Sequence, residues 1–179
     1  MVIKMKKRTF FVMLILFLVF LDSMILIVSI VILKNRLSTA RDKCLAEHYV
    51  IASSLIGDMQ ALEQRGNNVE ESIGQLMGSY SRYMQGKGNG LAVSFSGEWI
   101  YESSAPLPEE NRKSPPDMGY TQERIVYMEN GSSPFLYVYG SFPAPGQDYG
   151  LMYIGTLSDT ISAWRHVKDA LFLMGAAMM

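Results

Sequence analysis

Cysteine and histidine are scarce in this sequence, and their scarcity excludes several kinds of site. Cys44 is the only cysteine, so no intrachain disulfide can form. An intersubunit disulfide through Cys44 stays open beside the simpler interpretation of a small apolar residue on a helix. The two histidines, His48 and His166, show no metal-ligand spacing and no Ser-His-Asp context. We therefore expect no metal site, no catalytic residue and no cofactor in this chain.

Motifs for phosphate and nucleic-acid binding are also missing. The glycine cluster at residues 86–90 lacks the G-x-x-x-x-G-K-[ST] order of a phosphate loop and is interpreted as a turn. The chain has 16 Lys and Arg against 17 Asp and Glu. The leading cations Lys4, Lys6, Lys7 and Arg8 leave the remainder mildly acidic, without a basic stripe. No nucleic-acid partner is expected, and a small molecule or a protein remains open as the ligand.

A long apolar run at residues 10–33 directly follows these cations. A helix of that length rises roughly 36 Å, enough to cross a hydrocarbon core about 30 Å thick. Because Lys and Arg stay on the cytoplasmic side, residues 1–9 are predicted to be cytoplasmic and residues 34–169 to lie outside. A signal peptide cleaved after Ala40 is the competing interpretation. The run is too long for a signal h-region, however, and Lys34 and Arg36 precede the candidate cleavage site.

Residues 170–179 form a second apolar run, shorter than the roughly 20 residues that a crossing needs. We expect it to be the start of a second transmembrane helix. Two membrane anchors around one outside domain are typical of a transmembrane receptor. An exported domain of this size without disulfides fits a bacterial envelope.

Asp22 is an ionisable residue inside the first apolar run, where a carboxylate costs at least a few kcal/mol. It is expected to be protonated or to face a partner helix, and the neighbouring Ser23 could donate a hydrogen bond. Two interpretations stay open. Asp22 and Ser23 either form a polar contact that senses helix displacement, across a dimer or with the second membrane helix, or have only an assembly role.

Residues 34–85 are predicted to be helical, in two helices with apolar faces. His48 lies on the first face, as a packing residue or, alternatively, as a pH switch. Asn68 is expected to cap the second helix. The predicted faces are Leu45, His48, Ala52, Leu55, Met59 and Leu62 in the first helix, and Val69, Ile73, Leu76, Tyr80 and Tyr83 in the second.

From residue 91 the apolar period changes to two, which predicts about five antiparallel strands within residues 91–157. A hairpin at residues 91–102 is followed by an irregular, proline-containing segment at 103–118. Strands are then predicted near 122–129, 135–142 and 149–157. The fold class is α+β, with the helices covering one face of the sheet.

Aromatic side chains alternate along these strands, with Arg124 among them. A tyrosine-rich face beside a guanidinium could hold an amino acid or another small carboxylate. Core and cross-strand packing is the alternative. The candidate ligand-binding residues are Trp99, Tyr101, Arg124, Tyr127, Tyr137, Tyr139 and Tyr153.

This order of elements resembles the N-terminal sensor region of bacterial two-component sensor histidine kinases with a PDC-like (Cache or PAS-like) extracytoplasmic domain. The hairpin at residues 91–104 and the strand-to-helix step at Leu157, Ser158 and Asp159 carry the resemblance locally. It implies a homodimer in the bacterial cell membrane that passes an outside stimulus to a kinase core beyond Met179. That core would be a transferase that uses ATP and Mg²⁺, with a response regulator as its partner. Neither histidine here has the H-E-x-x-x-P pattern of a phosphoacceptor.

Other classes of protein share parts of this layout. A chemoreceptor or a cyclic-dinucleotide enzyme would use the same input module. A membrane-anchored envelope protein with a binding or assembly role would lack a signalling output. A secreted binding domain would need cleavage after Ala40.

Overall fold

The structure, a computed structural model, describes residues 2–66, 69–85, 88–103, 107–116, 124–129, 134–144 and 147–177. Side chains are described within these ranges except at 2–7, 69–71, 83, 85, 124–129, 142–144, 147–148 and 174–177. The predicted cap at Asn68 lies outside the described residues, as do residues 104–106 and 117–118 of the irregular segment. Contacts divide the chain into two units, Met1–Ser38 with Asp159–Met179, and Thr39–Ser158.

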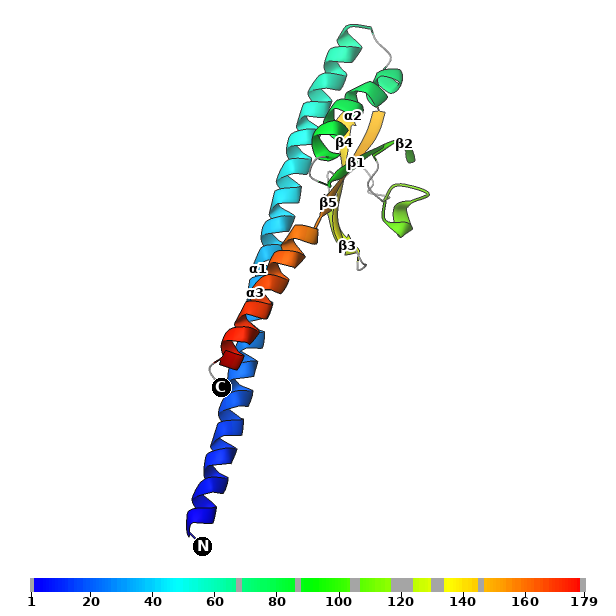
Figure 1. Cartoon of the computed structure of the whole chain (residues 1–179). Coiled ribbons are helices and arrows are strands. Elements are labelled where there is room, and N and C mark those ends of the chain that lie inside the picture. The colour runs from blue at the N-terminus through cyan, green and yellow to red at the C-terminus, as the bar shows by residue number, and fades with distance from the viewer. Residues whose placement is uncertain are drawn as a thin grey trace. The chain divides into compact units, whose positions relative to one another are not determined.

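Two described α-helices precede the strands and one follows them, as in an α+β chain (Figure 1). The described helices are α1 (Val2–Gln64), α2 (Val69–Gln85), α3 (Ser158–Ala177) and the short 3-10 helix η1 (Glu109–Asn111). The strands are β1 (Gly90–Phe95), β2 (Glu98–Glu102), β3 (Arg124–Glu129), β4 (Phe135–Ala144) and β5 (Gln147–Thr156). The α+β class, the long N-terminal helix, the shorter helices and the antiparallel sheet are thus confirmed.

The sheet of the unit Thr39–Ser158 has the strand order β2-β1-β5-β4-β3, and its described pairs are antiparallel. β1 and β5 are neighbouring inner strands, with Leu91 opposite Tyr153 and Val93 opposite Leu151. Successive side chains of a strand point to opposite faces. One face therefore carries Leu91, Val93, Leu151 and Tyr153. The other carries the residues between them.

α1 covers the face that carries Leu151 and Tyr153. His48 of α1 donates a hydrogen bond from Nε2 to the carbonyl oxygen of Leu151, at 3.0 Å. Cys44, one turn earlier, lies against Gly155, where an added Cβ would come within 2.6 Å of the thiol sulfur. The buried residues of α1 recur at helical spacing: Cys44, His48, Ile51, Ala52, Leu55 and Met59. Each fully buried large side chain contributes about 1.5–3 kcal/mol, so this stripe fixes the helix on the sheet.

α2 buries a face that is rotated by one residue from the predicted one. Ile73 is buried as expected, and Met77, Ser81 and Met84 are the other described buried positions of α2. Leu76 and Tyr80, predicted for the core, are only half-buried. The side chains of Val69 and Tyr83 lie outside the described ones. Residues three and four positions apart both lie on the same side of a helix. The predicted face of α2 and the neighbouring face that is actually buried therefore show the same spacing in the sequence.

The hairpin between β1 and β2 turns at Ser96 and Gly97. Both residues have positive φ, 48° and 82°. Two consecutive positive φ angles are the signature of a type I′ turn, whose twist suits a two-residue hairpin. Glycine has no steric penalty in this conformation, so Gly97 permits the tight connection.

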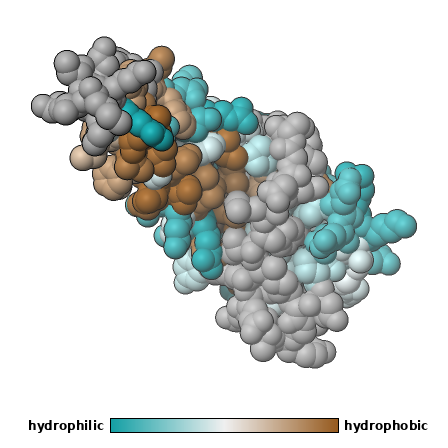
Figure 2. Space-filling view, turned by 90° about the horizontal axis from the view of Figure 1, so that it is seen from below, coloured by the Kyte–Doolittle hydropathy of each residue, from teal (hydrophilic) through white to brown (hydrophobic). Residues whose placement is uncertain are grey.

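The other unit joins the N-terminal part of α1 to α3. α1 is the helix, among those described, that is long and apolar enough to cross a membrane by length and composition. Its large apolar side chains are exposed almost continuously from Phe10 to Val31. Figure 2 shows the hydrophobic surface (brown) gathered in one region of the chain. Such a surface is too extensive for an ordinary water-facing helix and favours a lipid environment.

Replacing Gly150 with alanine is expected to destabilise the sheet. A Cβ at this position would lie 2.1 Å from the Tyr139 hydroxyl and 2.5 Å from the Ser94 hydroxyl. Relieving such overpacking costs about 1–3 kcal/mol. We expect Gly150→Ala to lower the midpoint of thermal unfolding, followed by circular dichroism of the chain in lipid nanodiscs. Gly57→Ala is the control, since nothing lies within 4 Å of its Cβ and alanine favours a helix. Equal midpoints for the two variants would contradict the packing described here.

Candidate functional site

The aromatic face of the sheet is a closed cluster. Tyr137 and Tyr139 of β4 are buried on the face opposite α1. Leu107, from the segment between β2 and β3, is buried against them. The full cluster is Ala92, Leu107, Tyr137, Tyr139, Met152 and Ile154, with Trp99 and Phe135 packed at its edge. Tyr137 and Tyr139 therefore have a core-packing role, which was the alternative to a ligand pocket.

Polar groups at this face are paired within the protein. The hydroxyls of Ser94 and Tyr139 lie 2.9 Å apart in a buried hydrogen bond. Trp99 donates from Nε1 to the carbonyl oxygen of Asn111 at 2.8 Å, which fastens η1 to the sheet. The Trp99 ring meets the Tyr139 ring edge to face, with centroids 6.1 Å apart. Burial raises the pKa of Tyr139, against a smaller lowering by its hydrogen bond to Ser94.

Tyr153 lies on the opposite face from Tyr137 and Tyr139, so the candidate residues do not form one site. Its hydroxyl donates to the Glu47 carboxylate of α1 and accepts a hydrogen bond from Asn89 Nδ2 at 2.7 Å. Asn89 Oδ1 also accepts from the backbone N–H of Thr156, at 3.1 Å. Asn89 stands in the predicted glycine turn, and only the tertiary structure reveals its linking role.

The remaining candidate residues lie on the outer strands. Tyr101 of β2 is half-buried and pairs with Val93, whose side chain is on the face covered by α1. Arg124 and Tyr127 belong to β3, opposite Gly140 and Tyr137 of β4. Their side chains lie outside the described ones. The expected approach of Arg124 to the aromatic residues therefore stays a prediction.

Cys44 and His48 are packed into the interface between α1 and the sheet. The Cys44 thiol is buried, and burial together with Glu47 raises its pKa from 9.0 to about 11, against a smaller lowering by Lys43. His48 is 2 % exposed, and a carbonyl oxygen can only accept, so Nε2 carries the proton of its bond to Leu151. The structure gives both residues a packing role.

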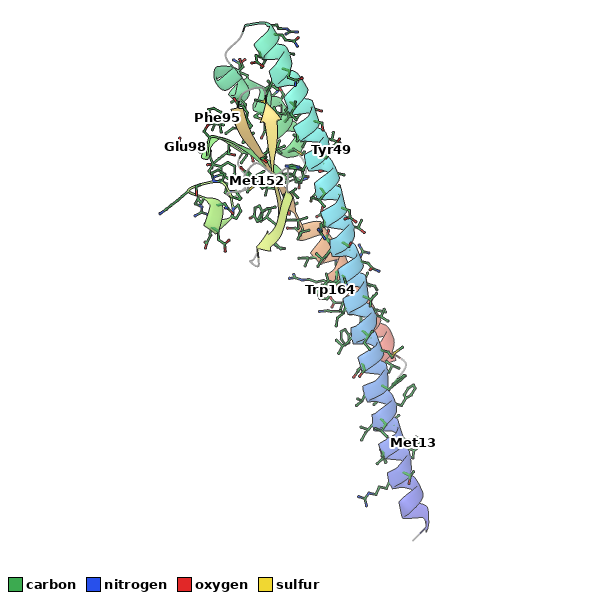
Figure 3. The ribbon with its side chains drawn as sticks, turned by 180° about the vertical axis from the view of Figure 1, so that it is seen from behind. Met13, Tyr49, Phe95, Glu98, Met152 and Trp164 are labelled. Atoms are coloured by element: carbon green, nitrogen blue, oxygen red, sulfur yellow. The ribbon has the colours of Figure 1, made fainter. Side chains whose placement is uncertain are left out.

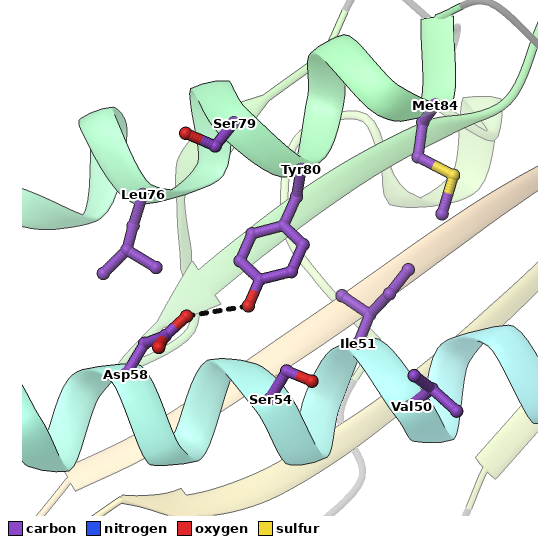
Figure 4. Close-up of a pocket in the computed structure, with 8 residues that line it drawn as sticks. All are labelled: Val50, Ile51, Ser54, Asp58, Leu76, Ser79, Tyr80 and Met84. Atoms are coloured by element: carbon purple, nitrogen blue, oxygen red, sulfur yellow. Dashed lines mark hydrogen bonds between the residues drawn. The ribbon is translucent and has the colours of Figure 1, made fainter.

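A groove lies between α1 and α2 (Figure 4). Its volume is about 510 Å³, within the range of small-molecule sites. Apolar side chains form most of its wall, and the Tyr80 hydroxyl donates to Asp58 Oδ2 at 2.7 Å across it. The lining residues are Val50, Ile51, Ser54, Asp58, Leu76, Ser79, Tyr80 and Met84.

Asp58 gives this groove its charge. It is the one ionisable carboxylate among the eight lining residues, and none of the eight is a cation. Partial burial and then the hydrogen bond to Asp58 raise the pKa of Tyr80 from 10.0 to about 12. Tyr80 is therefore a neutral donor at physiological pH, held toward one oxygen of Asp58. Sequence periodicity had assigned Leu76 and Tyr80 to the core and so missed this groove.

In the helical unit, a polar contact joins α3 to α1. Trp164 of α3 donates from Nε1 to the carbonyl oxygen and the hydroxyl of Ser29, both at 3.1 Å (Figure 3). Ser29 is buried, and Leu21 and Ile25 are partly covered on the same side of α1. Asp22 is exposed. The candidate pair Asp22 and Ser23 thus lies off the α3-facing stripe.

Ser23 is bonded within its own helix. Its hydroxyl donates to the carbonyl oxygen of Val19 at 2.7 Å. This local bond is the usual one for serine inside a helix. The predicted contact between Asp22 and α3 is therefore absent among the described interactions, and a contact across a dimer stays a prediction.

No family model, curated protein or solved structure matches this chain. Among the residues searched, no group of three or more His, Cys, Asp or Glu side chains lies close enough to hold a metal ion.

Cys44 is expected to react slowly with a maleimide while the protein is folded. A buried thiol with a pKa of about 11 is almost fully protonated at pH 8, and only the thiolate reacts. We expect rapid labelling only after unfolding, measured by mass spectrometry. The control is Ser53→Cys in a Cys44→Ala background, because Ser53 is exposed on the same helix. Similar native rates at the two positions would show that Cys44 is accessible, as an intersubunit disulfide requires.

Asp58→Asn is expected to lower the pKa of Tyr80 from about 12 toward 10, because it removes the negative charge beside the hydroxyl. Burial keeps the pKa above 10. In the unchanged protein, the stabilisation from the raised pKa is complete below pH 10 and is lost as the pH rises from 10 to 12. Ultraviolet difference titration against Tyr80→Phe isolates this residue, and Asp42→Asn is the matched control. An unchanged pKa in Asp58→Asn would rule out the bond.

Proposed function

We propose that this chain is the sensor and membrane-anchor part of a transmembrane receptor, with a PDC-like domain outside the membrane. The observation that carries the proposal is the direct passage from sheet to helix. β5 ends at Thr156 and α3 begins at Ser158, so only Leu157 separates the inner strand from the helix. A shift of β5 is transmitted to α3 without an intervening loop.

The contact of Trp164 with Ser29 supports a membrane boundary at this level. Tryptophan favours the interface between lipid and water. Lys168 lies one turn further along α3, about 6 Å deeper. Its ammonium lies 5.5 Å from the centre of the Trp164 ring, and thus reaches back toward the same level. Long cationic side chains near a membrane surface adopt this arrangement.

With the boundary near Ser29, Asp22 lies about 10 Å inside the bilayer. That depth is short of the centre of a core about 30 Å thick, where the cost of a carboxylate is greatest. Asp22 faces away from α3, so a second copy of α1 is the partner that this proposal assigns to it. A homodimer would bring two such residues together.

The mechanism proposed is a change between two packings of α1 against β5. The buried stripe of α1 and its bond from His48 to Leu151 define one packing. A stimulus that favours another packing shifts the population by its difference in affinity for the two. α3 carries this shift to the cytoplasmic side as a piston, tilt or rotation. The output that best suits this layout is a histidine kinase core beyond Met179, acting through a response regulator.

The proposed topology is tested by labelling single cysteines in intact bacteria. In a Cys44→Ala background, Ser53→Cys is expected to react with a membrane-impermeant maleimide. Lys6→Cys is expected to react only after the membrane is opened. Reaction of Lys6→Cys in intact cells, or protection of Ser53→Cys, would overturn the orientation. Release of the chain as a soluble product would instead support a secreted binding domain.

The signalling output is tested in the full-length protein that contains this chain. A histidine within H-E-x-x-x-P after the second membrane helix, with autophosphorylation from ATP in isolated membranes, would support the kinase. Trp164→Phe keeps an aromatic side chain but removes the indole N–H, and is expected to change the basal phosphorylation at equal expression. Ser162→Ala is the control, since the Ser162 hydroxyl donates to the backbone carbonyl oxygen of Asp159 on the same helix. A long coiled coil without that histidine would favour a chemoreceptor, and a stop codon soon after Met179 would contradict both.

A further inference from the structure

We infer that the groove between α1 and α2 binds a small organic amine with an apolar body. The groove is about 510 Å³ in volume and belongs to one compact unit. Val50, Ile51, Leu76 and Met84 supply apolar wall. Among the described lining residues, Asp58 supplies the only charge, so we expect a ligand with one cationic group and one apolar part.

The Asp58 carboxylate is prepared for a cation by its neighbours. The Tyr80 hydroxyl donates to Oδ2 at 2.7 Å, which orients the group and leaves Oδ1 as an acceptor. Figure 4 shows Asp58 and Tyr80 pointing toward each other between the helices, with Ser54 one turn away on α1. An ammonium contributes three donors, which matches a carboxylate oxygen and nearby hydroxyls. A carboxylate ligand would instead meet the like charge of Asp58.

The other lining residues form an apolar wall that contacts the apolar part of the ligand. Met84 is 3 % exposed and Ile51 is 6 % exposed, so the floor of the groove is firmly packed. Val50 is 61 % exposed at the rim. An alkyl chain in contact with these residues leaves water, which gives binding energy in proportion to its buried area. An amine of about six carbons has both parts.

Amine binding is distinct from the amino-acid or carboxylate ligand expected at the sheet. The aromatic face is filled by Leu107 and has its described hydroxyls paired. The groove therefore offers the alternative place for a stimulus, on the helix that the proposed sensor uses for transmission. The inference rests on the proposed function only for its biological meaning, because binding is measured without any signalling output.

The test follows the methyl resonances of methionine in the full chain, labelled with carbon-13 and held in lipid nanodiscs. Met84 lines the groove, whereas Met152 is buried in the cluster on the far face of the sheet. Hexylamine is expected to shift the Met84 resonance saturably and to leave Met152 unchanged. 1-Hexanol should bind about fivefold more weakly, and hexanoate more weakly still, since only the head group differs.

Asp58→Asn provides the matched variant, because it keeps the shape and an acceptor for Tyr80. It is expected to weaken hexylamine binding about fivefold and to leave 1-hexanol binding unchanged. Asp42→Asn, an exposed acid roughly 24 Å away along α1, should leave both unchanged. An unchanged Met152 resonance in each variant confirms that the fold is retained.

Three results would overturn the inference. Met84 could fail to respond to hexylamine, or hexylamine and 1-hexanol could bind equally well. The Met84 resonance could also be unchanged by hexylamine, 1-hexanol and hexanoate but differ between nanodiscs that hold one copy of the chain and those that hold two. That result would show that a second copy of the chain occupies the groove. The topology and phosphorylation experiments are unaffected by these results, so the two proposals fail separately.

Discussion

The structure of the outside unit depends on the packing of α1 against the inner strands of the sheet. Cys44, His48 and Leu55 lie on one side of the helix and are buried there. This contact joins residues about a hundred positions apart, as in the bond from His48 to Leu151. Gly155 has no side chain at the point of closest approach, which lets Cys44 reach the strand. A helix held in this way cannot move without a response in β5, and β5 leads directly into α3.

Much of this fold could be predicted from periodicity, since burial on one side imposes a repeat on the sequence. His48, Ala52, Leu55 and Met59 recur at helical spacing and are buried as predicted. The alternation of Leu91 and Val93 with Ala92 correctly assigned opposite faces to them. Periodicity was less decisive in α2, because positions three and four residues apart are both close on a helix. Leu76 was consequently assigned to the core instead of Met77.

The candidate site was harder to predict, because a site is defined by what covers each face. Tyr137 and Tyr153 have similar sequence surroundings, yet Leu107 covers the first and α1 contacts the second. Nothing in the irregular segment distinguishes Leu107 as the residue that closes the aromatic face. The hydrogen bond between Asp58 and Tyr80 joins α1 and α2, and no local sequence pattern specifies that these two side chains meet. The aromatic residues therefore led us to predict a ligand site on the sheet, whereas the groove described here lies between α1 and α2.

The position of the groove has a mechanical consequence for the proposed sensor. Ile51 is shared, since it lies on the buried stripe of α1 and also lines the groove. A ligand that fills the groove therefore contacts a side chain that also holds α1 in place. Binding changes the balance of two packings only if the ligand distinguishes between them. An apolar amine held by Asp58 and Ile51 of α1 and by Met84 of α2 would make that distinction, because a rotation of α1 changes the positions of its two side chains relative to Met84.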